Sequence, residues 1–270
     1  MFTPTPRQAQ ILALARQSGR VSVEDLAGRF DVTPQTIRKD LNDLSDQRLL
    51  SRTHGGAMLL SGVENVAYDA RREIAAHEKA AIGERAAELI PDNASLFVNI
   101  GTTTEAVARA LVGRSGLLVI TNNIHVVTIL LPSPGVEVIC AGGLVRRSDG
   151  GIVGEATVDL VSQFKVDVAI IGASAIDIDG TLLDFDYREV RVAQKIIENA
   201  REVILVADRI KFSRKAPVRI GHVEQIDVLV TDRPPPEAFA EVCRQSGVRI
   251  VCVDPDAGPD AGADDETADG

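Results

Sequence analysis

The stretch from Val21 to Leu44 constrains the fold more than any other part of the chain. Its apolar residues recur at helical spacing, first at Val23, Leu26, Ala27 and Phe30 and then at Ile37, Leu41 and Leu44. Each set predicts a helix with one buried face. Between them, Thr33 can cap a new helix with its hydroxyl, and Pro34 suits the first helical position. We therefore predict two short helices joined by a tight turn.

The outer face of the second predicted helix carries side chains that suit DNA. These are Thr33 at the cap, followed by Gln35, Thr36, Arg38, Lys39 and Asn42. Such donors and acceptors match the base edges of a major groove and the phosphates beside it. Two short helices of this kind form a helix-turn-helix. A small helical hairpin with a solvated outer face is the alternative, and the turn length and the Thr-Pro start favour DNA binding over it.

Flanking segments complete this predicted domain. Arg7–Gln17 predicts a helix that packs behind the two-helix unit. Residues 48–57 are too short and too rich in glycine for a helix, and predict a strand, a turn and a return strand, which is a wing. Arg52 and His54 of this wing could reach phosphate or the minor groove. His54 also fits an ordinary exposed loop residue.

The formal net charge of −10 does not exclude DNA binding, because the charge is unevenly placed. The segment up to Ala57 is slightly basic, whereas the end of the chain, from Asp254 to Asp269, carries acids and no base. A local excess of base is what a DNA-binding domain requires.

Composition and the start of the chain limit the class of protein. The first residues lack the apolar core of a signal peptide, and no apolar run approaches the roughly 20 residues of a membrane span. We expect a soluble cytoplasmic protein. Cys140, Cys243 and Cys252 form no CxxC pair and lie in apolar contexts, which predicts three buried, reduced thiols and no metal site. We expect no cofactor.

We expect 270 residues to form a small and a larger domain. We place the DNA-binding domain at 1–57, a linker at 58–76, an α/β domain at 77–253 and a disordered acidic tail at 254–270. Strands are expected at Ser95–Ile100, Leu117–Thr121, Val136–Cys140, Val166–Gly172, Val203–Ala207, Val228–Thr231 and Arg249–Val253. Helices are expected at Thr104–Leu111, Asn123–Leu130, Glu155–Gln163, Val190–Ala200 and Glu237–Gln245. This alternation predicts a mostly parallel sheet covered by helices.

Small and hydroxyl residues follow several of these strands. They are Gly101, Thr102, Thr103 and Thr104 after one strand, Thr121 and Asn122 after the next, and Gly142, Gly143 and Gly172 after two others. Ligands of open α/β sheets gather at such strand ends, and a helix N-terminus favours an anion. We interpret the set as a phosphate cradle. The alternative is that these residues are helix caps and tight turns, which any α/β domain needs.

Two further segments bear on this site. Lys211 offers a cation near another strand end, for the same phosphate or simply for solvent. The segment LLDFDYREVR, with Asp184 and Arg188, could bind a polyol and a phosphate, or Asp184 or Asp186 could merely cap the next helix. A Walker A sequence and a GxGxxG fingerprint are both missing from the sequence, so nucleotide binding has no support.

The chain up to about Val253 resembles transcriptional regulators of the DeoR family. The residues that carry the resemblance are VSVEDLAGRFDVTPQTIRKDLNDL with RTHGGA, then NIGTTT, TNN, AGG and IGASAIDIDG. Two other segments, DGGIVGEATVDLVSQF and LLDFDYREVR, resemble the subgroup that responds to glycerol 3-phosphate. Sister regulators respond to other sugar phosphates. The acidic tail departs from the family pattern, and we assign it no function.

The resemblance implies an α/β protein with an N-terminal winged helix-turn-helix and a C-terminal sensor domain of the ribose-phosphate-isomerase-like, Rossmann-related fold. It implies a homodimer or homotetramer that is released from operator double-stranded DNA by glycerol 3-phosphate or a related phosphorylated metabolite. Gln35, Thr36, Arg38 and Lys39 would then face DNA. The effector pocket would include Gly101, Thr102, Thr103, Asn122, Gly142, Gly172 and Lys211.

An enzyme is the competing class, because the implied sensor fold is shared with sugar-phosphate isomerases. Enolisation needs a carboxylate base and a partner acid. The available carboxylates are Asp177, Asp184, Asp186 and Glu189. None has an obvious histidine partner in the sequence, so we expect a repressor and no enzymatic activity.

Overall fold

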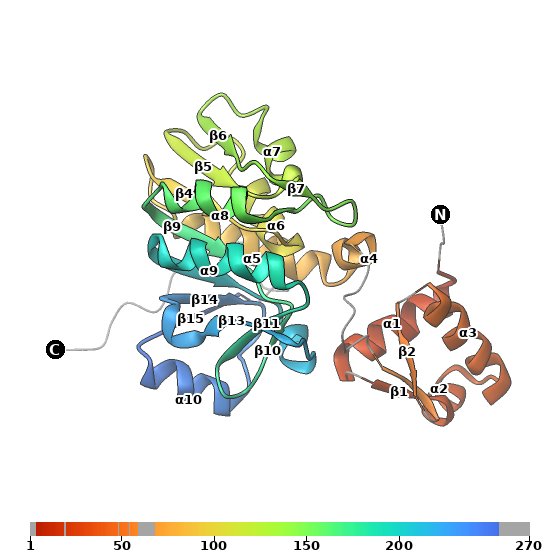
Figure 1. The fold of residues 1–270 in the computed structure, drawn as a ribbon. Coiled ribbons are helices and arrows are strands. Elements are labelled where there is room, and N and C mark those ends of the chain that lie inside the picture. Colours follow the sequence, from red (N-terminus) through yellow and green to blue (C-terminus); the bar gives the residue numbers. More distant parts are fainter. Residues whose placement is uncertain (1–3, 19, 48, 54, 59–67, 254–270) are drawn as a thin grey trace.

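The computed structural model describes residues 4–18, 20–47, 49–53, 55–58 and 68–253. Figure 1 shows a small N-terminal domain beside a larger α/β domain, with helix α4 (Tyr68–Glu73) on the side of the larger domain that faces the smaller one. None of the described helices is both long and apolar enough to cross a membrane. His54 and the acidic tail, for which we made predictions above, lie outside the described residues.

The N-terminal domain is a winged helix-turn-helix, as predicted. Its elements are α1 (Pro6–Ser18), β1 (Arg20–Ser22), α2 (Val23–Phe30), α3 (Pro34–Asp46), β2 (Ser51–Thr53) and β3 (Gly56–Met58). Strands β2 and β3 form the wing, and β1 pairs with the other edge of β3 in antiparallel register. Ile11, Leu26, Ile37, Leu41 and Leu44 are buried in its core. The apolar residues that recur at helical spacing in the sequence are therefore the ones buried in this core.

The larger domain is built on a parallel sheet. Among the described residues its seven strands have the order β15-β14-β12-β9-β4-β5-β6. Their bounds are β4 (Ser95–Val98), β5 (Leu117–Thr121), β6 (Val136–Cys140), β9 (Val166–Ile171), β12 (Ala200–Val206), β14 (Val228–Thr231) and β15 (Arg249–Cys252). Strands β5 and β6 follow β4 toward one edge of the sheet, and strands β12, β14 and β15 follow β9 toward the other edge. The point where this order reverses is where ligands bind in such folds.

Helices cover both faces of this sheet (Figure 1). One face carries α5 (Ala76–Glu88), α6 (Thr102–Ala110) and α7 (Ile124–Leu130), and the other carries α8 (Glu155–Ser162), α9 (Tyr187–Glu198) and α10 (Glu237–Gln245). Strand residues alternate between the two apolar cores: Phe97 packs on the second face, and Leu96 and Val98 on the first. Burial of both faces explains why the strands are continuous apolar runs.

Smaller elements lie between the main strands and helices. They are β7 (Leu144–Val145), β8 (Ile152–Val153), β10 (Ala175–Ile176), β11 (Thr181–Asp184), β13 (Val218–His222), and the short 3-10 helices η1 (Arg209–Ser213) and η2 (Val223–Gln225). Strands β10, β11 and β13 form a separate antiparallel sheet, and β7 pairs with β8. These pairings are absent from the sequence-based prediction, as are helices α4 and α5.

The prediction of three buried cysteines is wrong for two of them. Cys243 is buried, but Cys140 and Cys252 are exposed. Cys140 ends β6 and Cys252 ends β15, which are the two edge strands of the large sheet. An edge strand lacks a neighbour on one side, so an apolar local sequence does not guarantee burial there.

Candidate functional site

Helix α3 presents the predicted DNA-contacting residues on one exposed face. Thr33 caps the helix: its Oγ1 accepts a hydrogen bond from the Thr36 backbone N–H at 3.3 Å. Pro34 occupies the start of the helix, as predicted. Thr33, Gln35, Arg38, Lys39 and Asn42 are exposed and Thr36 is half-buried, whereas the opposite face is buried. The structure thus brings these residues together on a surface free to meet a groove.

Asp40 fixes α3 from behind, which the sequence analysis missed. It is buried and accepts hydrogen bonds from Arg7 Nε at 2.6 Å and from Gln8 Nε2 at 3.3 Å, both on α1. These contacts hold α1 and α3 at a fixed angle. A polar residue at a buried helical position was the available signal.

The wing places Arg52 near the helix-turn-helix. Its exposed side chain donates from Nη1 to the Gly56 carbonyl at 2.9 Å, across the β2–β3 pairing. The guanidinium therefore joins β2 to β3 and stiffens the wing.

A second site lies at the carboxyl ends of the three central strands β4, β9 and β12. This sensor pocket is lined by Arg71, Ile100, Gly101, Thr102, Thr103, Thr104, Gly172, Ala173, Ser174, Asp184, Glu189, Val206 and Lys211. Seven of the predicted effector residues therefore meet in one place: Gly101, Thr102, Thr103, Thr104, Gly172, Asp184 and Lys211. Their assignment to an effector remains a prediction.

Helix α6 begins at this pocket, and its first turn suits an anion. Gly101 precedes the helix with φ of +152°, a backbone conformation open to glycine. The first N–H groups of a helix have no partner within it and carry partial positive charge. The Thr104 hydroxyl donates to the carbonyls of Asn99 and Gly101, at 2.7 and 2.8 Å. Thr104 thus holds the loop in shape, which leaves the hydroxyls of Thr102 and Thr103 as candidate donors.

Lys211 supplies a cation opposite this loop. Burial lowers its pKa to about 7, with Arg214, Lys79 and Arg71 adding to the effect and Asp208 opposing it. The ammonium group thus lies among other cations, and an anion in the pocket would stabilise its charged form.

A half-buried arginine, Arg146, binds the acidic residues beside the pocket. Arg146 forms ion pairs with Asp149 at 2.7 Å, Glu189 at 2.6 Å and Asp186 at 3.1 Å. Burial lowers the pKa of Arg146, but Glu189 and Asp149 outweigh it and raise the pKa above its ordinary value. Asp186 also caps α9, accepting a hydrogen bond from the Arg188 N–H at 2.8 Å.

Four predicted effector residues lie away from the sensor pocket. Asn122 is buried and donates to the Ile152 carbonyl at 3.2 Å. Gly142 and Gly143 lie in the bend after β6, packed against Thr157, whose hydroxyl donates to the Gly142 carbonyl at 2.8 Å. The side chain of Arg188 is half exposed and pairs with Asp186 at 2.9 Å. Asn122 follows β5 and the glycines follow β6, which lie one and two strands away from β4.

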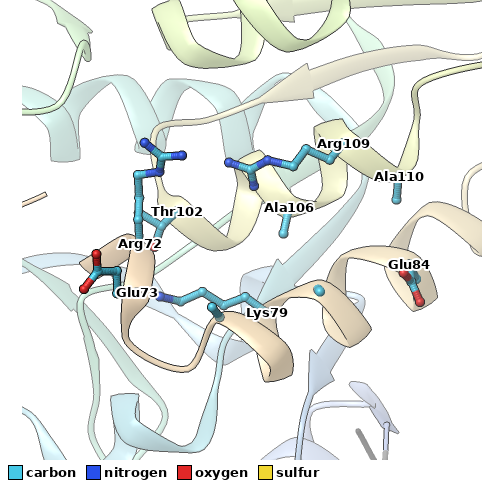
Figure 2. A pocket seen from close by; sticks show the side chains of 10 residues that line it. Arg72, Glu73, Lys79, Glu84, Thr102, Ala106, Arg109 and Ala110 are labelled. Atoms are coloured by element: carbon cyan, nitrogen blue, oxygen red, sulfur yellow. The ribbon is translucent and has the colours of Figure 1, made fainter. Parts of the chain in front are cut away.

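A larger groove lies on the outside of α5 and α6, with a volume of about 680 Å³. It is lined by Arg72, Glu73, Ala76, Lys79, Ala80, Glu84, Thr102, Ala106, Arg109 and Ala110 (Figure 2). In Figure 2, Arg72 and Arg109 extend to the same side of this groove. Its lining is mostly the surface of α4, α5 and α6, and it shares Thr102 with the sensor pocket.

Family models match both domains. The DeoR-like helix-turn-helix domain matches residues 7–63, and the DeoR C terminal sensor domain matches residues 74–233. These matches confirm the family and the fold class expected from the sequence.

Curated relatives match along nearly the whole chain. The glycerol-3-phosphate regulon repressor of Escherichia coli is 46% identical over 91% of this chain and 98% of its own length. The repressor of the same name from Haemophilus influenzae is 45% identical, over 91% of this chain and 95% of its length. The repressor CsqR of Escherichia coli is 39% identical over 95% of this chain and 98% of its length.

Solved structures align with parts of the chain. Ribose 5 phosphate isomerase A from Neisseria gonorrhoeae covers 50% of this chain and 52% of its own, with a TM-score of 0.37 and 16% identity. The beta subunit of eIF2B from Chaetomium thermophilum covers 65% of this chain and 56% of its own, with a TM-score of 0.45 and 18% identity. On the family models and the curated relatives, we conclude that the chain belongs to the DeoR family and is a transcriptional repressor rather than an enzyme.

Proposed function

We propose that this repressor controls genes of glycerol and glycerol 3-phosphate metabolism, and that glycerol 3-phosphate in the sensor pocket releases it from operator DNA. The observation that carries the proposal is the meeting of the α6 N-terminus with Lys211 at the central strand ends. That arrangement suits a phosphate group. The higher identity to two glycerol-3-phosphate regulon repressors than to CsqR supports glycerol 3-phosphate as the ester.

The DNA-binding half of the proposal rests on the exposed face of α3. We propose that Thr33, Gln35, Thr36, Arg38, Lys39 and Asn42, with Arg52 and His54 of the wing, contact double-stranded operator DNA in the cytoplasm. A homodimer or homotetramer would pair two such domains, which requires an inverted repeat with fixed half-site spacing. Release requires the effector to bind better to the free protein than to the operator complex, with a coupling of roughly 1–3 kcal/mol.

Another sugar phosphate is the second candidate effector, because the chain is also 39% identical to a repressor of a different name, CsqR, so the family match does not fix the ester. The polar segment that contains Asp184 and Arg188 would then bind the hydroxyl groups of a different polyol. The phosphate contacts proposed above would be unchanged.

The test is an operator-binding titration at fixed salt, using the DNA upstream of the chain's own gene and its neighbours. Anisotropy of labelled DNA is measured without effector and with glycerol 3-phosphate, glycerol, inorganic phosphate or a hexose phosphate. Release by glycerol 3-phosphate alone supports the proposal. Release by the hexose phosphate alone replaces the effector, and failure to prefer any of these sequences over random DNA rejects the operator assignment.

A further inference from the structure

Two adjacent arginines of α4, Arg71 and Arg72, line different cavities. Arg71 lines the sensor pocket together with Gly101, Thr102 and Lys211, whereas Arg72 lines the outer groove of Figure 2. The Arg71 side chain is 15% exposed, and its Nη2 lies 3.2 Å from Oδ2 of Asp149. Its Nε is buried and has no hydrogen-bond partner among the described residues. A guanidinium with an unused Nε donor therefore lines the pocket proposed for a phosphate.

The sensor pocket is too full to hold a phosphate ester as it stands. Its free volume is about 20 Å³, and a single water needs roughly 10–15 Å³ on such a measure. A lining group must move for an effector to bind. The loops after β4 and β9 are continuous with the central sheet, whereas Arg71 reaches in from a helix outside that sheet.

Contacts at both ends hold α4 against the sensor domain. The Tyr68 hydroxyl donates to Glu105 Oε2 at 2.8 Å, and the Tyr68 ring stacks on His125 with a centroid distance of 4.7 Å. Lys79 Nζ donates to the carbonyls of Arg71 and Ile74. Glu105 belongs to the first turn of α6, so α4 is bonded to the helix that begins at the pocket.

The segments that carry the pocket cations also touch the DNA-binding domain. Ile74 and Ala75, which follow α4, pack against the apolar cluster of the N-terminal domain. That cluster also contains Ile210, the neighbour of Lys211 in η1. A shift of Arg71 or Lys211 therefore acts directly on residues that position the DNA-binding domain.

We infer that Arg71 is an effector contact and that it connects occupancy of the sensor pocket to the position of the DNA-binding domain. This inference rests on the proposed function. Without effector, Arg71 pairs with Asp149 and fills part of the pocket. When a phosphate ester binds, the Arg71 guanidinium leaves Asp149 and forms a charge-assisted hydrogen bond to the phosphate dianion. Asp149 keeps its ion pair with Arg146. Helix α4 then moves with Arg71, and the DNA-binding domain moves with α4.

The experiment compares full-length wild-type protein with Arg71→Gln, Arg71→Lys and the matched control Arg72→Gln. Operator binding, and the glycerol 3-phosphate concentration that releases half the DNA, are measured for each, with direct binding by calorimetry. We expect Arg71→Gln to keep sequence-specific operator binding and to raise the half-release concentration at least about tenfold. Arg71→Lys should fall between, and Arg72→Gln should match the wild type.

Hydrogen exchange of residues 68–73 provides the readout that a purely structural role would not change. Glycerol 3-phosphate should alter this exchange in the wild type and in Arg72→Gln, but not in Arg71→Gln. Equal release and equal effector affinity in Arg71→Gln and wild type would overturn the inference. If Arg71→Gln fails to fold, Arg71→Lys decides on the same criteria. A wild type that binds operator but no phosphate ester rejects the proposed effector instead.

Discussion

Arg7 Nε of α1 lies 2.6 Å from Oδ2 of Asp40 on α3, whereas Arg38 and Lys39, the residues just before Asp40, are exposed. One face of α3 is thus bound to α1 through Asp40, and the opposite face, with Arg38 and Lys39, is exposed to solvent. Its position relative to DNA depends on a polar contact inside the domain as well as on the apolar core.

Loss of this contact should lower stability. We predict that Asp40→Ala lowers the free energy of unfolding of the N-terminal domain by about 1–2 kcal/mol, because Gln8 loses an acceptor and Arg7 loses its charged partner. Thermal and urea denaturation measure the change. Asp46→Ala, at the exposed end of the same helix, is the control and should stay within about 0.5 kcal/mol of wild type. Equal stability of Asp40→Ala and Asp46→Ala would contradict a fixing role for Asp40.

The exposed face of α3 should determine operator affinity. We predict that Arg38→Ala weakens operator binding by about 1–3 kcal/mol without changing stability, because a guanidinium contact to base or phosphate is lost. Arg85→Ala removes the same charge from an exposed position on α5 and serves as the control. Fluorescence anisotropy at several salt concentrations measures both variants. If Arg38→Ala and Arg85→Ala weaken operator binding equally, the loss reflects the net charge of the protein, and Arg38 lies outside the DNA interface.

The fold was predictable from the sequence where local pattern alone determines structure. Continuous apolar runs mark the strands of the large sheet, and the Thr33-Pro34 start marks α3. Only part of the sensor pocket was predictable from the sequence, because the residues that meet there depend on which strands are neighbours in the sheet. Gly101, Gly172 and Lys211 follow strands that are neighbours in the sheet, whereas Asn122 and Gly142 follow strands farther out.

The residues that were missed share a dependence on distant partners. Arg71 lies in a segment with weak periodicity, and its partner Asp149 is far away in the chain. Glu189 was named only as a candidate enzyme carboxylate, and its ion pair with Arg146, 43 residues earlier in the chain, was not foreseen. No local rule identifies such pairs, because the contact exists only after the sheet has brought the segments together.

Gly143 tests whether the glycine after β6 is structural. Its φ is +148°, and a Cβ there would lie 2.4 Å from Thr157 Oγ1 and 2.8 Å from the Val153 carbonyl oxygen. We predict that Gly143→Ala lowers stability by about 1–3 kcal/mol. Gly142→Ala is the matched control, since a Cβ at Gly142 has no neighbour within 4 Å. A stable Gly143→Ala protein with selectively weakened effector binding would instead return Gly143 to the effector site.

Lys211 should make release by the effector depend on pH. Its pKa is about 7 in the free protein, and a phosphate dianion beside it stabilises the ammonium form and raises this pKa. Above about pH 7, binding must therefore take up a proton, so effector affinity falls as pH rises, by at most about tenfold per pH unit, until the pKa of the complex is passed. Below about pH 6 the effector itself loses its second charge, which also weakens binding.

The strongest response is thus expected between these limits. Lys211→Met should remove the part of the decline that begins near pH 7, whereas ionisation of Glu189 in the same pocket, whose pKa burial raises to about 8, would still weaken binding at higher pH. Half-release concentrations of glycerol 3-phosphate, measured between about pH 5.5 and about pH 8.5, check this, with operator affinity recorded at each pH as the baseline. Lys211→Met should also bind the effector more weakly at about pH 6.5, where the wild-type ammonium is mostly charged. An alkaline decline of the same steepness in wild type and Lys211→Met would assign the proton to another group and remove Lys211 from the phosphate site.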